Sequence, residues 1–163
     1  MAIFINQQYR NTISLLIWMI IVFSIGFIIG SLTKSQISTW YETLNKSPLT
    51  PPNSIFPLVW SILYVILAIC GWKLWMDSKE HDIMTAKILY IIQLGLNWSW
   101  TPLFFQYHLT GISLLVLVMM DLLTSLIIFF IYPRIKILAF LMLPYLIWIL
   151  LATYLNFYIW QHN

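Results

Sequence analysis

The sequence predicts an all-α integral membrane protein, a single bundle of five transmembrane helices within residues 1–163. Apolar and aromatic residues make up 61% of the chain, charged residues only 8%, and the mean hydropathy is +0.88. A soluble domain would carry about 25% charged residues. Uncharged runs of about 20 residues also recur along the chain, and a helix of this length crosses a bilayer core about 30 Å thick.

Five apolar runs follow one another, and only the first two are separated by a long connection. We expect helices at about 13–32, 54–76, 88–107, 109–132 and 137–160, and a long loop at 31–53. The runs are continuous rather than alternating, which excludes the strands of an outer-membrane barrel. The first run exceeds the apolar part of a signal peptide and lacks a small-residue cleavage site, so we expect it to be retained as a helix.

The basic residues predict the side of the membrane that each connection faces. Lys and Arg are unequal between the two sides, with Arg10, Lys79, Lys87, Arg134 and Lys136 on one side and Lys34 and Lys46 on the other. Loops rich in Lys and Arg remain in the cytoplasm. We therefore expect a cytoplasmic N-terminus, with the C-terminus and the loop 31–53 outside, in a bacterial cytoplasmic membrane.

Three of the predicted helices carry flat aromatic and amide side chains on one face. Spacings of three and four residues place side chains on the same side of a helix. Such spacings relate Trp60 and Tyr64 in the second helix, Gln93, Asn97, Trp100 and Phe104 in the third, and Pro144, Trp148, Ala152 and Asn156 in the fifth. Because an amide facing lipid is costly, we expect these faces to meet around a cavity for a flat, apolar ligand. The alternative is ordinary packing of tryptophans within the bundle.

This interpretation assigns two groups of candidate residues. The predicted ligand-binding residues are Trp60, Tyr64, Asn97, Trp100, Trp148, Ala152 and Asn156. The predicted lid over the cavity consists of the loop residues Trp40, Tyr41, Pro51 and Pro52. The alternative for the loop is a plain connection between two helices, which is unusual at this length. Pro102 and Pro144 free backbone carbonyl groups and would widen the cavity.

Other polar and small residues leave several roles open. Asp121 in the fourth helix is either a buried structural residue, the partner of a basic group or part of a proton path, and we favour the structural role. Gly26 and Gly30 permit close helix approach, either within the bundle or in a homodimer. No histidine lies within a span, which argues against haem ligation, and Cys70 is the single cysteine. We expect no metal site, no required cofactor and no nucleic-acid partner.

Three motifs occur in order along the chain. The first joins Trp40 and Tyr41 to Pro51, Pro52, Trp60 and Tyr64; the second is Leu-Asn-Trp-Ser-Trp at 96–100; the third is Pro-Tyr-Leu-Ile-Trp at 144–148, followed by Asn156. With these motifs the chain resembles the TspO/MBR family. The resemblance implies a bundle, often dimeric, whose cavity is closed by the first loop and binds porphyrins. It places Trp60, Asn97, Trp148 and Ala152 in that cavity. Trp60 and Trp148 match tryptophans implicated in porphyrin breakdown in some bacterial members.

The sequence departs from the family pattern in two places. Lys46-Ser47-Pro48-Leu49 lacks the tryptophan of the family's loop, so the lid has one aromatic side chain fewer. No Lys or Arg follows Tyr158, and a sterol is therefore a weaker candidate ligand than a tetrapyrrole. We predict a receptor or carrier for a porphyrin or haem-type tetrapyrrole. The alternatives are an enzyme-like, light- or oxidant-dependent porphyrin degradation, with Trp60 and Trp148 as catalytic candidates, and a structural or regulatory membrane partner without a ligand.

Overall fold

Five long helices and two short helical turns make up the described part of the chain. The computed structural model describes residues 2–76 and 81–163, with side chains from Tyr9 and from Ile83 onward in these two parts. The elements in chain order are α1 (Ala2–Thr39), η1 (Tyr41–Thr43), α2 (Ile55–Met76), α3 (His81–Thr101), η2 (Pro102–Gln106), α4 (Thr110–Ile131) and α5 (Lys136–His162). No strand occurs among these described residues, and the predicted all-α fold is confirmed.

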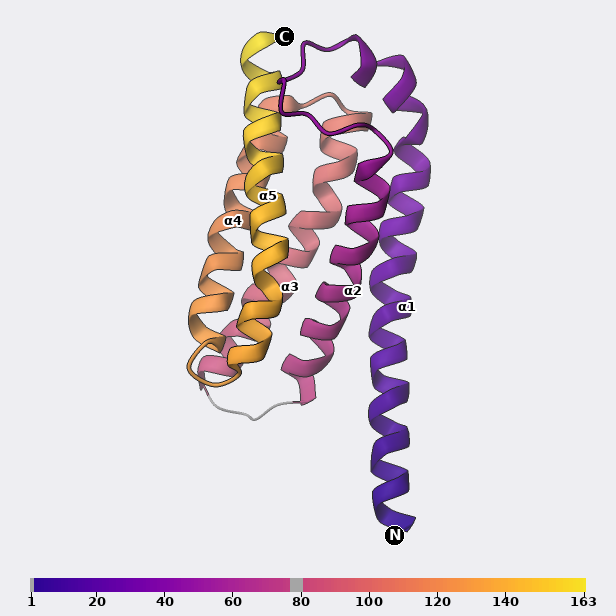
Figure 1. Cartoon of the computed structure of the whole chain (residues 1–163), viewed down its shortest axis with the longest axis vertical. Coiled ribbons are helices and arrows are strands. Elements are labelled where there is room, and N and C mark those ends of the chain that lie inside the picture. The colour runs from indigo at the N-terminus through magenta and orange to yellow at the C-terminus, as the bar shows by residue number, and fades with distance from the viewer. Residues whose placement is uncertain (1, 77–80) are drawn as a thin grey trace.

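Four of the helices are long and apolar enough to cross a membrane. They are Tyr9–Thr39 within α1, and all of α2, α4 and α5. α3 is less apolar because it carries buried polar side chains such as Gln93 and Asn97, which are 0% and 2% exposed. α3 nevertheless packs lengthwise against α4 inside the bundle (Figure 1). A helical membrane protein is thus confirmed, and a fifth span formed by α3 stays a prediction.

The core lies between α2, α3, α4 and α5. Each of these helices contributes side chains without exposed surface, namely Leu67, Tyr90, Met120 and Tyr145. Lipid tails are as apolar as most of these side chains, so close packing and interhelical hydrogen bonds hold such a bundle together, rather than exclusion of water. One such bond joins α3 to α2, since the Tyr90 hydroxyl donates to the carbonyl oxygen of Leu67 at 2.7 Å.

α1 lies at the edge of the bundle and packs mainly against α2 (Figure 1). Its outward side chains Leu16, Ile20 and Phe27 are 54%, 64% and 76% exposed. Exposed apolar side chains of this kind are typical of a helix that faces lipid. At about 1.5 Å per residue, its 38 residues extend about 57 Å, nearly twice the thickness of the bilayer core.

The predicted bounds of this first helix and of the loop after it are wrong. The helix expected at 13–32 continues to Thr39, and the loop expected at 31–53 therefore starts later, at Trp40. The hydroxyl groups of Thr33, Ser38 and Thr39 donate to carbonyl oxygens three or four residues earlier. These bonds give the polar hydroxyl groups partners on the helix itself. The end of an apolar run marks the end of lipid contact, which is a different boundary from the end of the helix.

The other predicted helices differ from the structure by smaller amounts. α2, α4 and α5 begin and end within two residues of the predicted ranges, whereas α3 begins at His81 instead of 88. Its predicted last residues, 102–107, are not α-helical, because Pro102 opens the π-helical turn η2. The predicted connection 77–87 includes Asp77, Lys79 and Glu80. These three residues lie outside the described ones.

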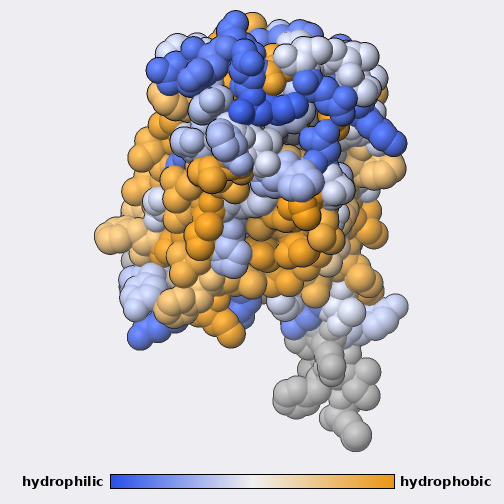
Figure 2. All heavy atoms as spheres, turned by 45° about the horizontal axis from the view of Figure 1, so that its top comes forward, coloured by the Kyte–Doolittle hydropathy of each residue, from blue (hydrophilic) through white to orange (hydrophobic). Residues whose placement is uncertain are grey.

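The loop 40–54 between α1 and α2 crosses the end of the bundle where α5 ends (Figure 1). Figure 2 shows hydrophilic residues gathered at this end and apolar residues below it on the face in view. The backbone N–H of Asn45 donates to Oδ1 of Asn163 at 2.9 Å, and its side-chain amide donates to the carbonyl oxygen of His162 at 3.1 Å. Ser47 Oγ donates to the Tyr154 hydroxyl at 3.2 Å. The loop is therefore fastened to α5.

Candidate functional site

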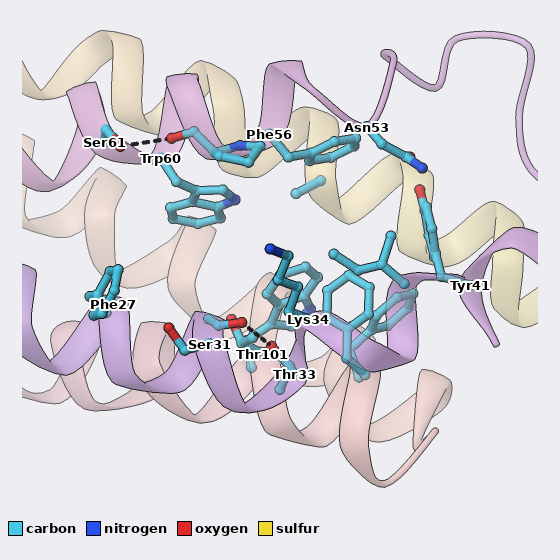
Figure 3. A pocket seen from close by; sticks show the side chains of 18 of the residues that line it. Phe27, Ser31, Thr33, Lys34, Tyr41, Asn53, Phe56, Trp60, Ser61 and Thr101 are labelled. Atoms are coloured by element: carbon cyan, nitrogen blue, oxygen red, sulfur yellow. Dashed lines mark hydrogen bonds between the residues drawn. The ribbon is translucent and has the colours of Figure 1, made fainter. Parts of the chain in front are cut away.

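A cavity of about 610 Å³ lies between α1, α2, α5 and the turn from α3 into η2. Figure 3 shows Phe27 and Ser31 of α1 on one side of it and Trp60 of α2 on the other. Tyr41 and Asn53, from the two ends of the loop 40–54, lie together at one end. The lining is mostly apolar and aromatic, and this is the composition of sites for small apolar ligands.

Aromatic rings form one wall of this cavity. The Trp60 and Trp100 rings lie 6.3 Å apart between centroids at an interplanar angle of 28°. Trp100 and Phe104 lie 5.4 Å apart at 19°. These three rings, stacked in sequence, come from α2, α3 and η2, and all three line the cavity. We refer to Trp60, Trp100 and Phe104 as the aromatic wall. Flat faces of this kind suit stacking with a planar ligand.

The π-helical turn η2 places part of this wall. Pro102 lacks a backbone N–H and cannot continue the α-helical bonding pattern, and the chain widens into a π-helical turn from Pro102 to Gln106. Thr101, Phe104 and Phe105 all line the cavity. Turns of this kind are frequent at functional sites. Pro144 lies inside α5 but is absent from the lining.

Asn156 holds Trp100 in place. The indole N–H of Trp100 donates to Oδ1 of Asn156 at 3.2 Å, and the Asn156 amide donates to the carbonyl oxygen of Thr110 at 2.7 Å. Asn156 is 2% exposed. Both ends of its amide are thus used within the protein, at the junction of α3, α4 and α5. Its geometry is that of a residue that orients the aromatic wall.

The structure brings five of the seven predicted ligand-binding residues to the cavity, and two lie elsewhere. The five residues that line it are Trp60, Tyr64, Trp100, Ala152 and Asn156. Asn97 lies in the core, where its side-chain amide donates to the Tyr145 hydroxyl at 3.0 Å, as does that of Gln93. Asn97 is therefore not the polar contact within the cavity that its spacing predicts. The interhelical bond to Tyr145 explains why it avoids lipid.

Trp148 also lies outside the lining. Its ring meets Phe56 edge to face, with centroids 5.9 Å apart at 69°, and Phe56 itself lines the cavity. The indole nitrogen of Trp148 is buried and has no hydrogen-bond partner among the described residues. Trp148 thus packs against a lining residue, Phe56, without bordering the cavity itself. Of the two tryptophans predicted as catalytic candidates, Trp60 borders the cavity and Trp148 does not.

Of the predicted lid residues, too, only some line the cavity. Tyr41 lines the cavity and is 6% exposed, whereas Trp40, Pro51 and Pro52 do not line it. Trp40 instead stacks on His108 at 4.0 Å between centroids and contacts Phe104 edge to face. Burial raises the pKa of the Tyr41 phenol, and that phenol remains neutral. Trp40 therefore anchors the loop, and Tyr41 faces the cavity.

Sequence reasoning missed the contribution of α1. Gly26, Gly30 and Lys34 line the cavity at intervals of four residues, and Phe23, Phe27 and Ser31 form a second row with the same interval. A Cβ atom at Gly26 would overlap the Tyr64 ring, whereas one at Gly30 would meet no atom within 4 Å. The close approach at Gly26 thus occurs within the bundle. The interval from the glycine pair to Lys34 was the signal in the sequence.

Asp121 lies away from the cavity, between α4 and α5. One carboxylate oxygen accepts a hydrogen bond from the Thr153 hydroxyl at 2.7 Å. The other oxygen is buried and without a partner among the described residues. Its contact joins two helices, as the structural role would require.

The chain is similar to several named proteins over most of its length. It is 35% identical to a tryptophan-rich protein TspO of Archaeoglobus fulgidus over 153 residues, which are 94% of this chain and 99% of that protein. It is 33% identical to a translocator protein of Bos taurus over 145 residues, 85% and 83% of the two chains. With a tryptophan-rich sensory protein of Cereibacter sphaeroides it shares 32% identity over 128 residues, 78% of each.

The family model described as the TspO/MBR family matches residues 17–161. This range includes residues from all five helices, the loop 40–54 and the whole lining of the cavity. From a match of this extent it follows that the chain belongs to the TspO/MBR family.

Proposed function

We propose that this protein is a membrane receptor or carrier that binds a porphyrin-type tetrapyrrole, or a similarly flat apolar ligand, in the cavity beside α1. The aromatic wall is the observation that carries the proposal, because its three stacked rings give the cavity an aromatic surface that a planar, apolar molecule can contact. A volume of about 610 Å³ falls within the range of small-molecule sites. The names of the sensory and translocator relatives support a receptor or transport role.

The proposal includes five membrane spans, with α3 as the third and the N-terminus in the cytoplasm of a bacterial cell. The two chain ends lie at opposite ends of the bundle (Figure 1), in keeping with an odd number of spans. Arg134 and Lys136 lie at the end opposite to the loop 40–54, in keeping with a cytoplasmic connection there. An alkaline phosphatase fused after residue 163 should be active, because that enzyme matures only outside the cytoplasm. An inactive fusion with correct membrane insertion would contradict this orientation.

A titration with protoporphyrin tests the binding proposal. In detergent-purified protein kept in the dark, tryptophan fluorescence should fall to a plateau as protoporphyrin is added. Trp60→Ala removes one ring of the aromatic wall and should raise Kd by roughly 10- to 100-fold, since losing a stacking side chain costs about 1–3 kcal/mol. Trp148→Phe should change Kd much less, because Trp148 does not border the cavity.

Trp75→Ala is the matched control, because Trp75 is 44% exposed and is absent from the lining. It should reduce total fluorescence and leave Kd unchanged. Quenching without a plateau, or equal affinity in all four proteins, would contradict binding at the aromatic wall. The absence of saturable binding would instead favour a structural or regulatory partner.

Porphyrin degradation is a second candidate function, and the position of Trp60 beside the cavity is the observation that favours it. Porphyrin absorbance should then decline under illumination in air, persist in the dark, and stop declining in Trp60→Phe. Full recovery of intact porphyrin after illumination would leave the receptor or carrier function alone.

A further inference from the structure

Lys34 is the one charged side chain among the described residues that line the cavity. Figure 3 shows its ammonium group reaching from α1 into the cavity, toward the side formed by Trp60 and Phe56. Lys34 lies five residues before the end of α1 at Thr39, a position from which a lysine could equally extend its amine outward to water. The observed direction is inward.

No described carboxylate neutralises this ammonium group. In the parts of the chain that the structure describes, Lys34 has neither a hydrogen bond nor an ion pair. Glu42 accepts a bond from Asn53 at 3.4 Å, and Asp121 is bound to Thr153 between α4 and α5. The Lys34 side chain is exposed at the cavity, so its ammonium group is accessible to an anionic group of a ligand and can form a charge-assisted hydrogen bond with it.

The other described lysines have partners. Lys46, Lys87 and Lys136 each place their ammonium group over an aromatic ring, at 4.8, 5.9 and 5.8 Å from the centroid. Lys73 also has an interaction. Lys34 differs from all of them, although aromatic rings surround it in the cavity.

We propose that Lys34 binds a carboxylate of the ligand, so that this cavity selects planar aromatic anions over neutral molecules of the same shape. The inference rests on the proposed function and specifies its ligand class. The ring system of the ligand would stack on the aromatic wall, and its acidic group would point toward Lys34. The amide of Asn53 and the hydroxyl of Ser31, which also line the cavity, offer further donors to the same carboxylate.

Two forms of one porphyrin test the inference. Protoporphyrin carries two carboxylates, and its dimethyl ester keeps the ring without the charges. Each is titrated in a non-ionic detergent into the unmodified protein and into Lys34→Met, which keeps the length of the side chain and removes its charge. Lys34→Arg restores a cation, and Lys136→Met removes a lysine at the far end of the bundle.

For the acid, Lys34→Met should raise Kd about tenfold, since a hydrogen bond to a charged group contributes about 1.5–3 kcal/mol. For the ester its Kd should equal that of the unmodified protein. Lys34→Arg should stay within about threefold of the unmodified protein, and Lys136→Met should have no effect. The same loss for acid and ester would overturn the inference, because Lys34 would then act through packing alone. No loss for either would overturn it as well.

The proposed function and this inference fail in different ways. If neither porphyrin binds the unmodified protein saturably, both fail. If both porphyrins bind with one shared Kd in all variants, the proposed function stands and the Lys34 inference falls. A phosphate of an anionic lipid is the other source of negative charge. Loss of co-purifying phosphatidylglycerol in Lys34→Met, with unchanged porphyrin affinity, would assign Lys34 to the lipid and overturn its role in ligand selection.

Discussion

Asn156 shows how a side chain that looks suited to ligand recognition is used by the protein itself. Its spacing from Trp148 and Ala152 predicts a polar group facing a cavity, and it does border one. Its oxygen, however, accepts from Trp100 and its amide nitrogen donates to Thr110. With 2% of its surface exposed, the Asn156 side chain also leaves little of its amide accessible to a ligand. We therefore assign it to the orientation of Trp100.

A double-mutant cycle tests this assignment. Asn156→Ala leaves the Trp100 indole N–H unpaired, whereas the Thr110 carbonyl group keeps the hydrogen bond from the Ser113 hydroxyl. The change should lower the free energy of unfolding by about 1–3 kcal/mol. In a Trp100→Phe background the same change should cost less, because the indole N–H that it would leave unpaired is already absent. Thermal unfolding in detergent measures both. Additive effects would show that the two side chains do not act together.

At the scale of elements, the contact between α1 and α2 depends on small residues, since Gly71 of α2 lies against the Trp18 ring of α1 and Gly26 of α1 lies against the Tyr64 ring of α2. Gly26 faces the Tyr64 ring so closely that a Cβ atom there would lie 2.7 Å from Cζ, whereas Gly30 faces open space. The two glycines belong to one sequence motif but have different roles in the structure. Gly26 permits the close approach to Tyr64, and Gly30 leaves room in the cavity.

Alanine substitution should separate these two glycines. Gly26→Ala should destabilise the protein by about 1–3 kcal/mol, because Tyr64 or α1 must shift to relieve the overlap. Gly30→Ala should be neutral or slightly stabilising, since alanine favours a helix over glycine by up to about 1 kcal/mol. Thermal unfolding compares the two variants. A larger loss at Gly30 than at Gly26 would place the critical contact on another surface, such as a dimer interface.

The elements also show what the sequence could and could not predict. Apolar runs predict where α2, α4 and α5 lie, because lipid demands such runs. They do not predict which side of α1 faces the cavity, and only the interval from Gly26 and Gly30 to Lys34 marks that side. For α3, the sequence also did not predict which residues of one face reach the cavity. Asn97 and Trp100 share a predicted face, yet Asn97 bonds to Tyr145 in the core while Trp100 joins the aromatic wall. That division depends on packing partners from other helices.

At the scale of the whole molecule, the loop 40–54 closes one end of the bundle by holding on to α5. The attachment consists of Asn45 with Asn163 and His162, and of Ser47 with Tyr154. The same loop brings Tyr41 and Asn53 to the cavity. Residues far apart in the chain thereby determine how easily the cavity is reached.

Weakening this attachment should speed ligand exchange. Asn45→Ala removes the side-chain bond to His162 and should increase amide hydrogen exchange in residues 44–50, with little change in α2 or α4. Association and dissociation of protoporphyrin should both become faster, with Kd changed by less than about threefold. Stopped-flow quenching measures these rates. Asn11→Ala, at the other end of α1, serves as the control. Unchanged rates together with unchanged exchange would mean that the loop does not limit access.

The near-parallel arrangement of Trp60 and Trp100 also gives the protein an optical signature. Two indoles 6.3 Å apart at 28° are close enough for their electronic transitions to couple. Such coupling produces a circular dichroism band in the near ultraviolet that neither ring gives alone. A molecule lying against this pair changes that band, whether the protein is in detergent or in lipid. Occupancy of the cavity is therefore readable without a label.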